Sequence, residues 1–125
     1  MSLLLDAGAL IAFERGSRVV QAFLERAARG GEPVRTTAGV VAQVWRRPSV
    51  QSGVARLLRG VEEAPLESSG ARRTGILLGA AKRADVVDAS LIDLARDGDE
   101  ILTSDPGDLA ALAYAAGKTL IITPV

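Results

Sequence analysis

The stretch Leu3-Leu4-Leu5-Asp6-Ala7-Gly8-Ala9-Leu10-Ile11 starts with an apolar run that stops at an acid and continues with small and apolar residues. Near the start of an α/β domain, this pattern predicts a buried strand that turns directly into a helix. Later strand candidates are also continuous apolar runs that do not alternate with polar residues. That pattern is typical of a parallel sheet covered by helices on both faces.

The remaining elements follow from turn and capping residues along the chain. Further strands are expected at residues 33–36, 61–66, 100–104 and 119–123. Helices are expected after Ser17, after Thr36 or Thr37, at 49–59 with Val50 inward, from Ser68 or Ser69 to Lys82, at about 86–97, and from Pro106. No linker, repeat or low-complexity stretch interrupts this order, so we expect one domain over residues 1–125.

The composition excludes several kinds of chemistry. The chain has no cysteine and no histidine, so disulfides, thiolate metal sites, cysteine nucleophiles and a histidine base are all excluded. Catalysis would have to use carboxylates, lysine, hydroxyls or a hard cation held by oxygen. No long apolar run or export signal is present, and we expect a cytoplasmic protein without membrane association.

Charge is unevenly distributed although the net charge is zero. Residues 15–83 contain thirteen Arg and Lys against five Asp and Glu, whereas residues 85–108 contain eight acids and one arginine. A basic body beside an acidic segment suits a protein that attracts a polyanion and also holds cations. Solvated helix surfaces are the simpler interpretation of the same pattern.

Acidic residues from distant segments are predicted to meet at one edge of the sheet. Asp6 ends the first strand and Asp105 follows the strand at 100–104, so both lie at the carboxyl edge, where parallel sheets bind ligands. Asp85 and Asp88 open the helix that precedes this strand, and its N-terminus must return to the same edge. Asp108 is expected to lean toward the same place.

Each of these acids also has a structural interpretation. Asp85 with Asp88, and Asp105 with Asp108, have the spacing of a helix cap and a first-turn acid. Asp6 has no evident capping role, which favours function there. Packed carboxylates repel one another and normally require a cation between them. Oxygen ligands without histidine or cysteine favour Mg²⁺ or Mn²⁺, and such a site is suited to phosphodiester hydrolysis.

Three segments, residues 4–11, 87–92 and 102–109, together resemble the PIN domain family. Their order, spacing and the chain length are most similar to the VapC ribonuclease toxins of toxin–antitoxin pairs. The resemblance implies a three-layer α/β/α sandwich with a mostly parallel sheet of about five strands. It also implies RNA cleavage with Mg²⁺ or Mn²⁺, a cognate antitoxin protein and a homodimer.

The resemblance also assigns roles to individual residues. Asp6, Asp88 and Asp105 match the family's metal-site aspartates, and Asp108 matches a frequent auxiliary acid. Gln43 stands where the family usually has a glutamate. An amide can orient a water or donate to a phosphate, but it adds no negative charge. Asp85 or Asp108 could compensate for the missing charge.

Other polar and aromatic residues are weaker candidates for a role in RNA binding or catalysis. Four arginines could grip RNA phosphates or simply cover a solvated helix, namely Arg46, Arg47, Arg56 and Arg59. Ser104 could hydrogen-bond a ligand water or satisfy backbone groups. Trp45 is expected to be a core or dimer contact rather than a platform for bases.

Two other classes of protein with an acidic pocket on a parallel sheet match this sequence poorly. A phosphate-accepting receiver domain needs an aspartate after the third strand, and residues 36–84 contain no aspartate. A haloacid-dehalogenase-type phosphatase needs Asp-x-Asp after the first strand, and Gly8 occupies the second position. The main alternative to a nuclease is a catalytically weak or inactive PIN-like module that binds RNA or protein, with Gln43 as the mark of lost activity.

Overall fold

The sheet of this protein is entirely parallel. The computed structural model describes residues 1–125. Its strands are β1 (Leu3–Leu5), β2 (Val34–Thr37), β3 (Glu62–Ala64), β4 (Glu100–Thr103) and β5 (Ile121–Pro124). They lie in the order β3-β2-β1-β4-β5, and every neighbouring pair is parallel. This confirms the predicted sheet.

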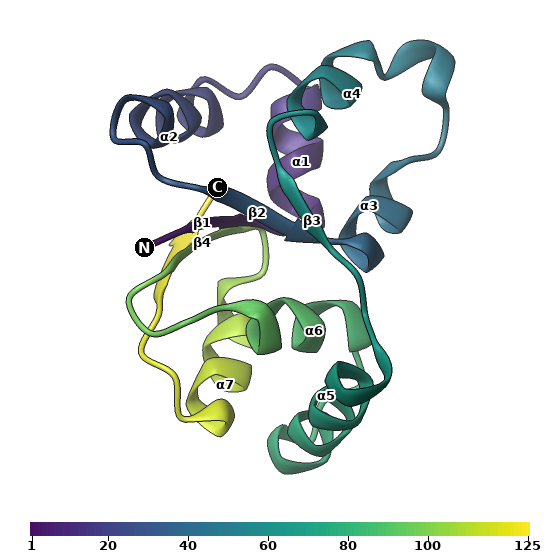
Figure 1. The fold of residues 1–125 in the computed structure, drawn as a ribbon, viewed down its shortest axis with the longest axis vertical. Coiled ribbons are helices and arrows are strands. Elements are labelled where there is room, and N and C mark those ends of the chain that lie inside the picture. The colour runs from purple at the N-terminus through teal and green to yellow at the C-terminus, as the bar shows by residue number, and fades with distance from the viewer.

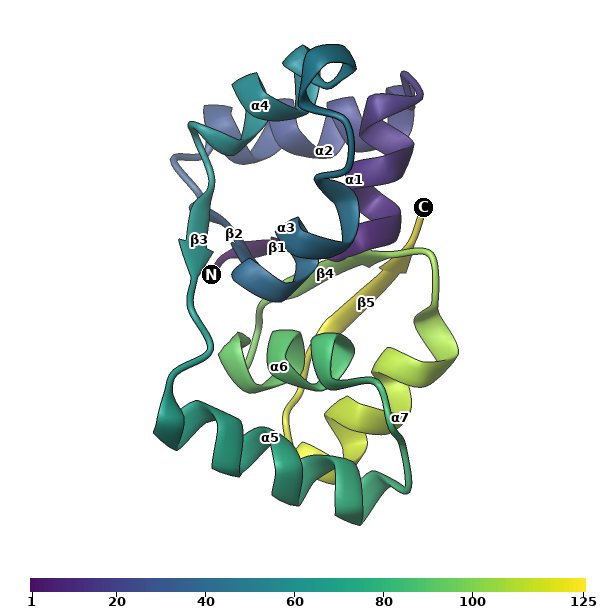
Figure 2. The same cartoon turned by 90° about the vertical axis from the view of Figure 1, so that its right-hand side faces the viewer.

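Helices cover both faces of the sheet and make a three-layer sandwich (Figure 1). On one face are α1 (Ala7–Glu14), α2 (Arg18–Arg29), α3 (Ala38–Val44), the 3₁₀ turn η1 (Pro48–Val50) and α4 (Ser52–Leu58). On the other are α5 (Ser68–Ala81), α6 (Val86–Leu94) and α7 (Pro106–Ala116). Figure 2 shows the same two helical layers from the side, with the strands between them.

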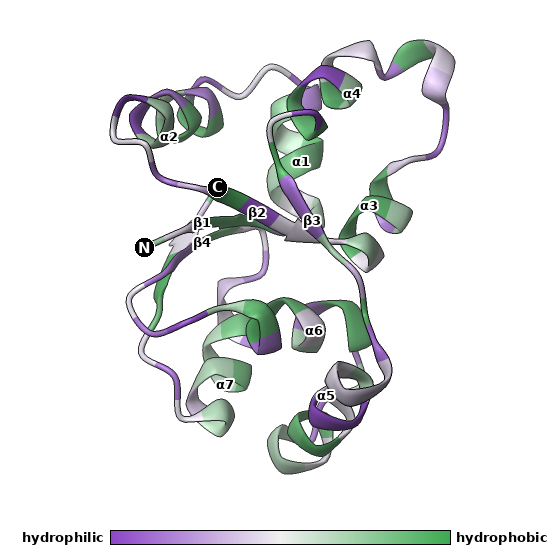
Figure 3. Cartoon of the chain, viewed as in Figure 1, coloured by the Kyte–Doolittle hydropathy of each residue, from purple (hydrophilic) through white to green (hydrophobic).

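The alternation of side chains along β1 divides the core into two halves. Leu3 and Leu5 belong to the buried cluster under α1–α4, and Leu4 belongs to the cluster under α5–α7. All three are fully buried, because successive strand residues point to opposite faces of a sheet. Figure 3 shows β1 and β4 as the hydrophobic centre of the molecule, with more polar segments around it. None of the helices combines the length and apolar character needed to cross a membrane.

Two helices differ from the prediction in their extent. The helix expected at 49–59 is split into η1 and α4, because Gln51 between them leaves the helical conformation and folds its buried side chain onto the preceding loop. Val50 is 63% exposed, so its predicted inward position was wrong. The helix expected to reach residue 97 ends at Leu94. There the Lys118 ammonium donates to three carbonyl oxygens, those of Ile92, Asp93 and Ala95, which satisfies the end of the helix.

Gly8 lies where α1 passes very close to the end of β4. A Cβ on Gly8 would overlap the Cβ and hydroxyl of Ser104, so only glycine permits this approach. By contrast, Gly79 in α5 has open space around its missing Cβ.

We therefore expect Gly8→Ala to destabilise the protein by about 1–3 kcal/mol, since it overpacks a rigid contact. Gly79→Ala, the matched control, should be neutral or stabilise by about 0.4–1 kcal/mol. Urea denaturation of both variants measures the difference. Equal stabilities of the two variants would show that α1 and β4 are not held in this close contact.

Candidate metal centre

The end of β1 and the end of β4 lie level with each other. Leu5 pairs with Leu102 in the parallel register, and the Asp6 amide donates to the Leu102 carbonyl at 3.2 Å. The chain leaves β1 toward β2 on one side and later adds β4 on the other side. Such a switch point opens a crevice at the carboxyl edge of the sheet. Asp6 directly follows β1, and Asp105 lies two residues after the end of β4.

Asp6 is 4% exposed and held on both sides of its carboxylate. One oxygen accepts from the Ala9 amide at 2.8 Å, which makes Asp6 the N-cap of α1. The other accepts from the Ser104 amide at 3.3 Å. The expectation that Asp6 has no capping role was therefore wrong. Asp6 is the single residue between β1 and α1, so the same residue ends the strand and caps the helix, and the sequence pattern showed only the strand end.

The N-terminus of α6 brings Asp85 and Asp88 to the same edge, but gives them different roles. The Asp85 side chain accepts from the Asp88 amide at 3.0 Å and caps the helix. This confirms the structural interpretation of Asp85, which is exposed. Asp88 lies in the first turn of α6 and is half-buried.

Three carboxylates form the tightest acidic group of the protein. Asp88, Asp105 and Asp108 each offer an oxygen, and these oxygens lie within 4.8 Å of one another. We call these three residues the acidic cluster. Asp6 is not part of it, whereas Asp108, expected only as an auxiliary acid, is. Asp108 also lies 3.3 Å from the Arg83 guanidinium.

Asp105 has a carboxylate that is free for a ligand. It precedes α7, yet its side chain makes no capping hydrogen bond, so the structural interpretation of Asp105 as a cap was wrong. Instead, its backbone amide donates to the Thr103 hydroxyl at 2.8 Å. Thr103 therefore positions Asp105, a role that the sequence did not indicate.

The surroundings raise the pKa of two of these acids. Burial, followed by the charges of Asp85, Asp6, Asp105 and Asp108, raises the pKa of Asp88 to about 7. Burial also raises the pKa of Asp6, although hydrogen bonds from Thr103 and from nearby backbone amides partly offset it. Asp6 therefore acts on the acidic cluster through its charge, although it lies outside the group of closest oxygens.

The donor set of the acidic cluster fits a hard divalent cation. It offers only oxygen atoms, and mutual repulsion disfavours the charged form of Asp88 when nothing positive lies between the carboxylates. Mg²⁺ and Mn²⁺ prefer oxygen ligands of this kind and complete their coordination with water. Asp88, Asp105 and Asp108 are the residues that would hold the ion.

The other predicted site residues lie outside the acidic cluster. Gln43 is exposed on α3 and lines a separate hollow of about 480 Å³. Arg46 and Arg47 line the same hollow, whereas Arg56 lies on α4 and Arg59 at its end; all four arginines are exposed. The Ser104 side chain is exposed next to Gly8.

No family model matches the sequence, and no curated protein does. Among solved structures, the chain is similar to a chain of VapBC2 from Rickettsia felis, crystallised bound to a DNA fragment from their promoter. The match covers 100% of this chain and 99% of the other, with a TM-score of 0.75 and 13% sequence identity.

This chain has a PIN-like α/β fold. The fold confirms the resemblance that the three motifs indicated, and it places the acidic cluster at the switch point of the PIN sheet.

Because the pKa of Asp88 is raised in the folded protein, the free energy of unfolding should depend on pH. The folded protein retains a proton that the unfolded chain, with a pKa near 3.8, releases. The stability from this group is therefore complete below pH 3.8 and is lost as the pH rises to about 7. Asp88→Asn should remove this part of the pH dependence. Urea denaturation in EDTA at pH 5 and pH 8 checks it. If the free energy of unfolding changes by the same amount between pH 5 and pH 8 in the wild type and in Asp88→Asn, the pKa of Asp88 is not raised.

Proposed function

We propose that this protein is a Mg²⁺- or Mn²⁺-dependent endoribonuclease that hydrolyses RNA phosphodiester bonds and serves as the toxin of a toxin–antitoxin pair. The observation that carries the proposal is the acidic cluster at the switch point of a VapC-like PIN fold. Oxygen-only ligands and a crevice at the carboxyl edge of the sheet suit metal-assisted phosphodiester hydrolysis. Asp6, Asp88 and Asp105 remain the proposed catalytic acids, with Asp108 as a further metal ligand.

The burial of each acid in the site indicates whether it can contact the ion directly. Asp105 is exposed and Asp88 and Asp108 are half-buried, so all three can reach an ion shared with an RNA phosphate. A bound divalent ion would polarise the phosphoryl group and lower the pKa of an attacking water. Asp6 is held in place by the Ala9 and Ser104 amides, and contributes negative charge from beneath the site. Because its pKa is about 7, Asp88 is partly protonated near neutral pH, and a bound cation would favour its charged form.

The proposed partners follow from the same site. A negatively charged crevice is blocked most directly by a basic side chain, and arginine forms the strongest pairs with carboxylates. We propose that a cognate antitoxin inserts such a side chain toward Asp6 and Asp88. The similar chain belongs to a complex of VapB with VapC, which supports an antitoxin partner. A homodimer is proposed from the resemblance alone.

A second candidate function is a PIN-like module that binds RNA or protein without cutting it. Gln43 favours this interpretation, because a neutral amide replaces the glutamate that related motifs carry. The acidic cluster favours the nuclease, because a binding module has no need to crowd three carboxylates within 4.8 Å.

We expect Asp88→Asn and Asp105→Asn each to abolish RNA cleavage while leaving the fold intact. Neutralising a ligand weakens metal binding and also relieves carboxylate repulsion, so the stability of the metal-free protein should hold or rise. Glu63→Gln, on the exposed edge strand β3, is the control for loss of one negative charge. The measurement is cleavage of total RNA with Mg²⁺ and with EDTA. Near-normal cleavage by either aspartate variant would refute the assigned site.

Gln43→Glu tests whether this position belongs to the metal site. The resemblance places Gln43 at the metal site, whereas the structure puts it in a separate hollow. If the resemblance holds, a carboxylate at this position should lower the Mg²⁺ concentration needed for half-maximal cleavage, since ligand charge helps to set cation affinity. The same change should slightly lower the melting temperature of the metal-free protein, because another carboxylate would face the others. Thermal melts with and without Mg²⁺ separate the two effects. If neither quantity changes, Gln43 acts only in the hollow that it lines.

A further inference from the structure

The loop that follows α3 is held in one conformation by a buried glutamine. Gln51 is only 4% exposed. Its side-chain oxygen accepts from the amides of Arg46 at 3.0 Å and Arg47 at 2.8 Å, and its side-chain nitrogen donates to the Val44 carbonyl at 2.9 Å. These three hydrogen bonds fix the backbone of the loop from inside, and its side chains are left to face outward.

The side chains presented by this loop are suited to a nucleic acid. Trp45 is 37% exposed, so the expected core contact was wrong, while the alternative of a dimer contact stays a prediction. Arg46 and Arg47 are exposed beside it. Neither arginine forms an ion pair within the chain. An exposed aromatic ring can stack on a base, and free guanidinium groups can bind phosphates.

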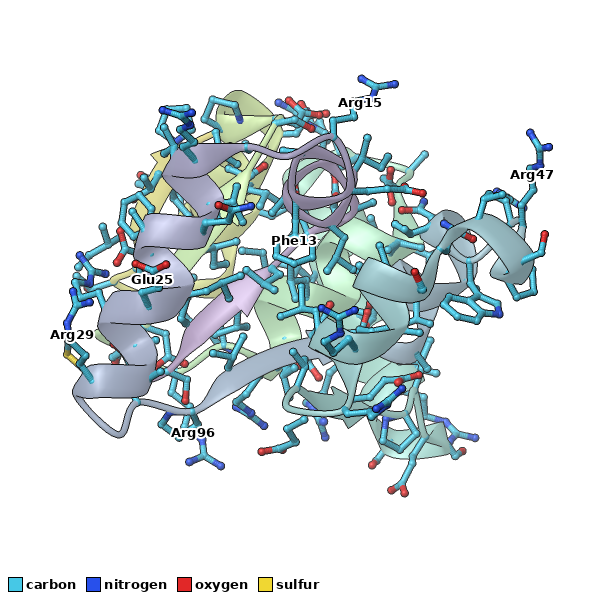
Figure 4. The ribbon with its side chains drawn as sticks, turned by 90° about the horizontal axis from the view of Figure 1, so that it is seen from above. Phe13, Arg15, Glu25, Arg29, Arg47 and Arg96 are labelled. Carbon is cyan, nitrogen blue, oxygen red and sulfur yellow. The ribbon has the colours of Figure 1, made fainter.

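A hollow of about 480 Å³ lies next to the loop and gathers further positive charge. Arg15, at the end of α1, lines it together with Arg46 and Arg47, while Glu14 is the single acid. Its volume is in the range of sites that bind ligands of nucleotide size. Figure 4 shows Arg15 and Arg47 extending outward from the ribbon.

Helix α1 connects this hollow to the acidic crevice. It begins at its cap Asp6 and ends at Glu14 and Arg15 beside the hollow. Its eight residues span about 12 Å, a distance that a few nucleotides can bridge. Basic residues at one end of the helix and carboxylates at the other match an RNA strand whose backbone is bound at one point and cut at another.

We propose that residues 45–47, held by Gln51 and joined by Arg15, form a docking surface for single-stranded RNA. This inference rests on the proposed ribonuclease function and extends it by naming where the substrate is held. Trp45 stacks on a base, the three arginines bind phosphates, and Gln51 is a positioning residue that acts only through the loop.

RNA binding in the absence of metal tests the surface separately from cleavage. The probe is a fluorescent single-stranded RNA oligonucleotide, and its affinity for the full chain is measured in EDTA over a range of salt concentrations. Trp45→Ala should weaken binding on the order of tenfold. The double variant Arg46→Ala/Arg47→Ala should weaken binding and also reduce the slope of log affinity against log salt by about 0.7 for each phosphate that is no longer neutralised.

Gln51→Leu distinguishes positioning from charge. Both arginines remain, so the salt slope should be retained, but affinity should fall because the loop must now be ordered on binding. Arg29→Ala is the matched control, because Arg29 is an exposed, unpaired arginine at the end of α2, far from Arg47 in Figure 4. It should change neither affinity nor slope. Mn²⁺-induced thermal stabilisation should be equal in all these variants, which shows that the fold and the acidic cluster are intact.

The outcomes separate this surface from the nuclease proposal. Loop-dependent RNA binding by a wild-type protein that cuts no RNA would support the surface and refute the nuclease. If the wild-type protein cleaves RNA and all the loop variants keep its RNA affinity and salt slope, the docking surface is refuted and the nuclease proposal stands. Absence of any RNA binding, or loop variants that impair only binding of a co-expressed protein partner, would also overturn it.

Discussion

The parallel register between β1 and β4 is the constraint on which the site depends. Leu3, Leu4 and Leu5 pair in order with residues 100–102, so the two central strands end at the same level. Everything that follows β1 and β4 is then forced into one small space at the carboxyl edge. The close approach of Gly8 to Ser104 and the bond from the Ser104 amide to Asp6 are direct results of this register.

The same register makes the edge electrostatically costly without a cation. α6 returns to the edge with Asp88, and α7 leaves it with Asp105 and Asp108, so three carboxylates meet above the buried Asp6. Backbone amides stabilise the charge on Asp6, and Arg83 pairs with Asp108. Asp88 has no such partner: its burial, followed by the charges of Asp85, Asp6, Asp105 and Asp108, raises its pKa to about 7. The charge imbalance is local to this edge, and a divalent ion is the simplest way to relieve it.

The sequence predicted the architecture well because strands and helices here carry strong local signals. The continuous leucines of β1, Pro106 at the first position of α7 and the Ser17 cap of α2 each specify structure within a few residues. The convergence of acids on one edge was also predictable, because it follows from topology. What the sequence could not predict depends on atomic contacts. Asp6 caps a helix, Asp105 does not, and Asp108 rather than Asp6 completes the closest group of oxygens. Gln51 is a further example, because a polar residue between two helices gives no sign that its side chain turns inward to organise the preceding loop.

The proposed function depends most on divalent-cation binding by the acidic cluster. Crystals grown with Mn²⁺ and measured near the manganese absorption edge test it directly, because the anomalous signal locates the ion without assumptions about the reaction. We expect one Mn²⁺ among the carboxylates of Asp88, Asp105 and Asp108, with water molecules completing its coordination. No ion at this edge at saturating Mn²⁺, or an ion bound only elsewhere on the chain, would contradict it.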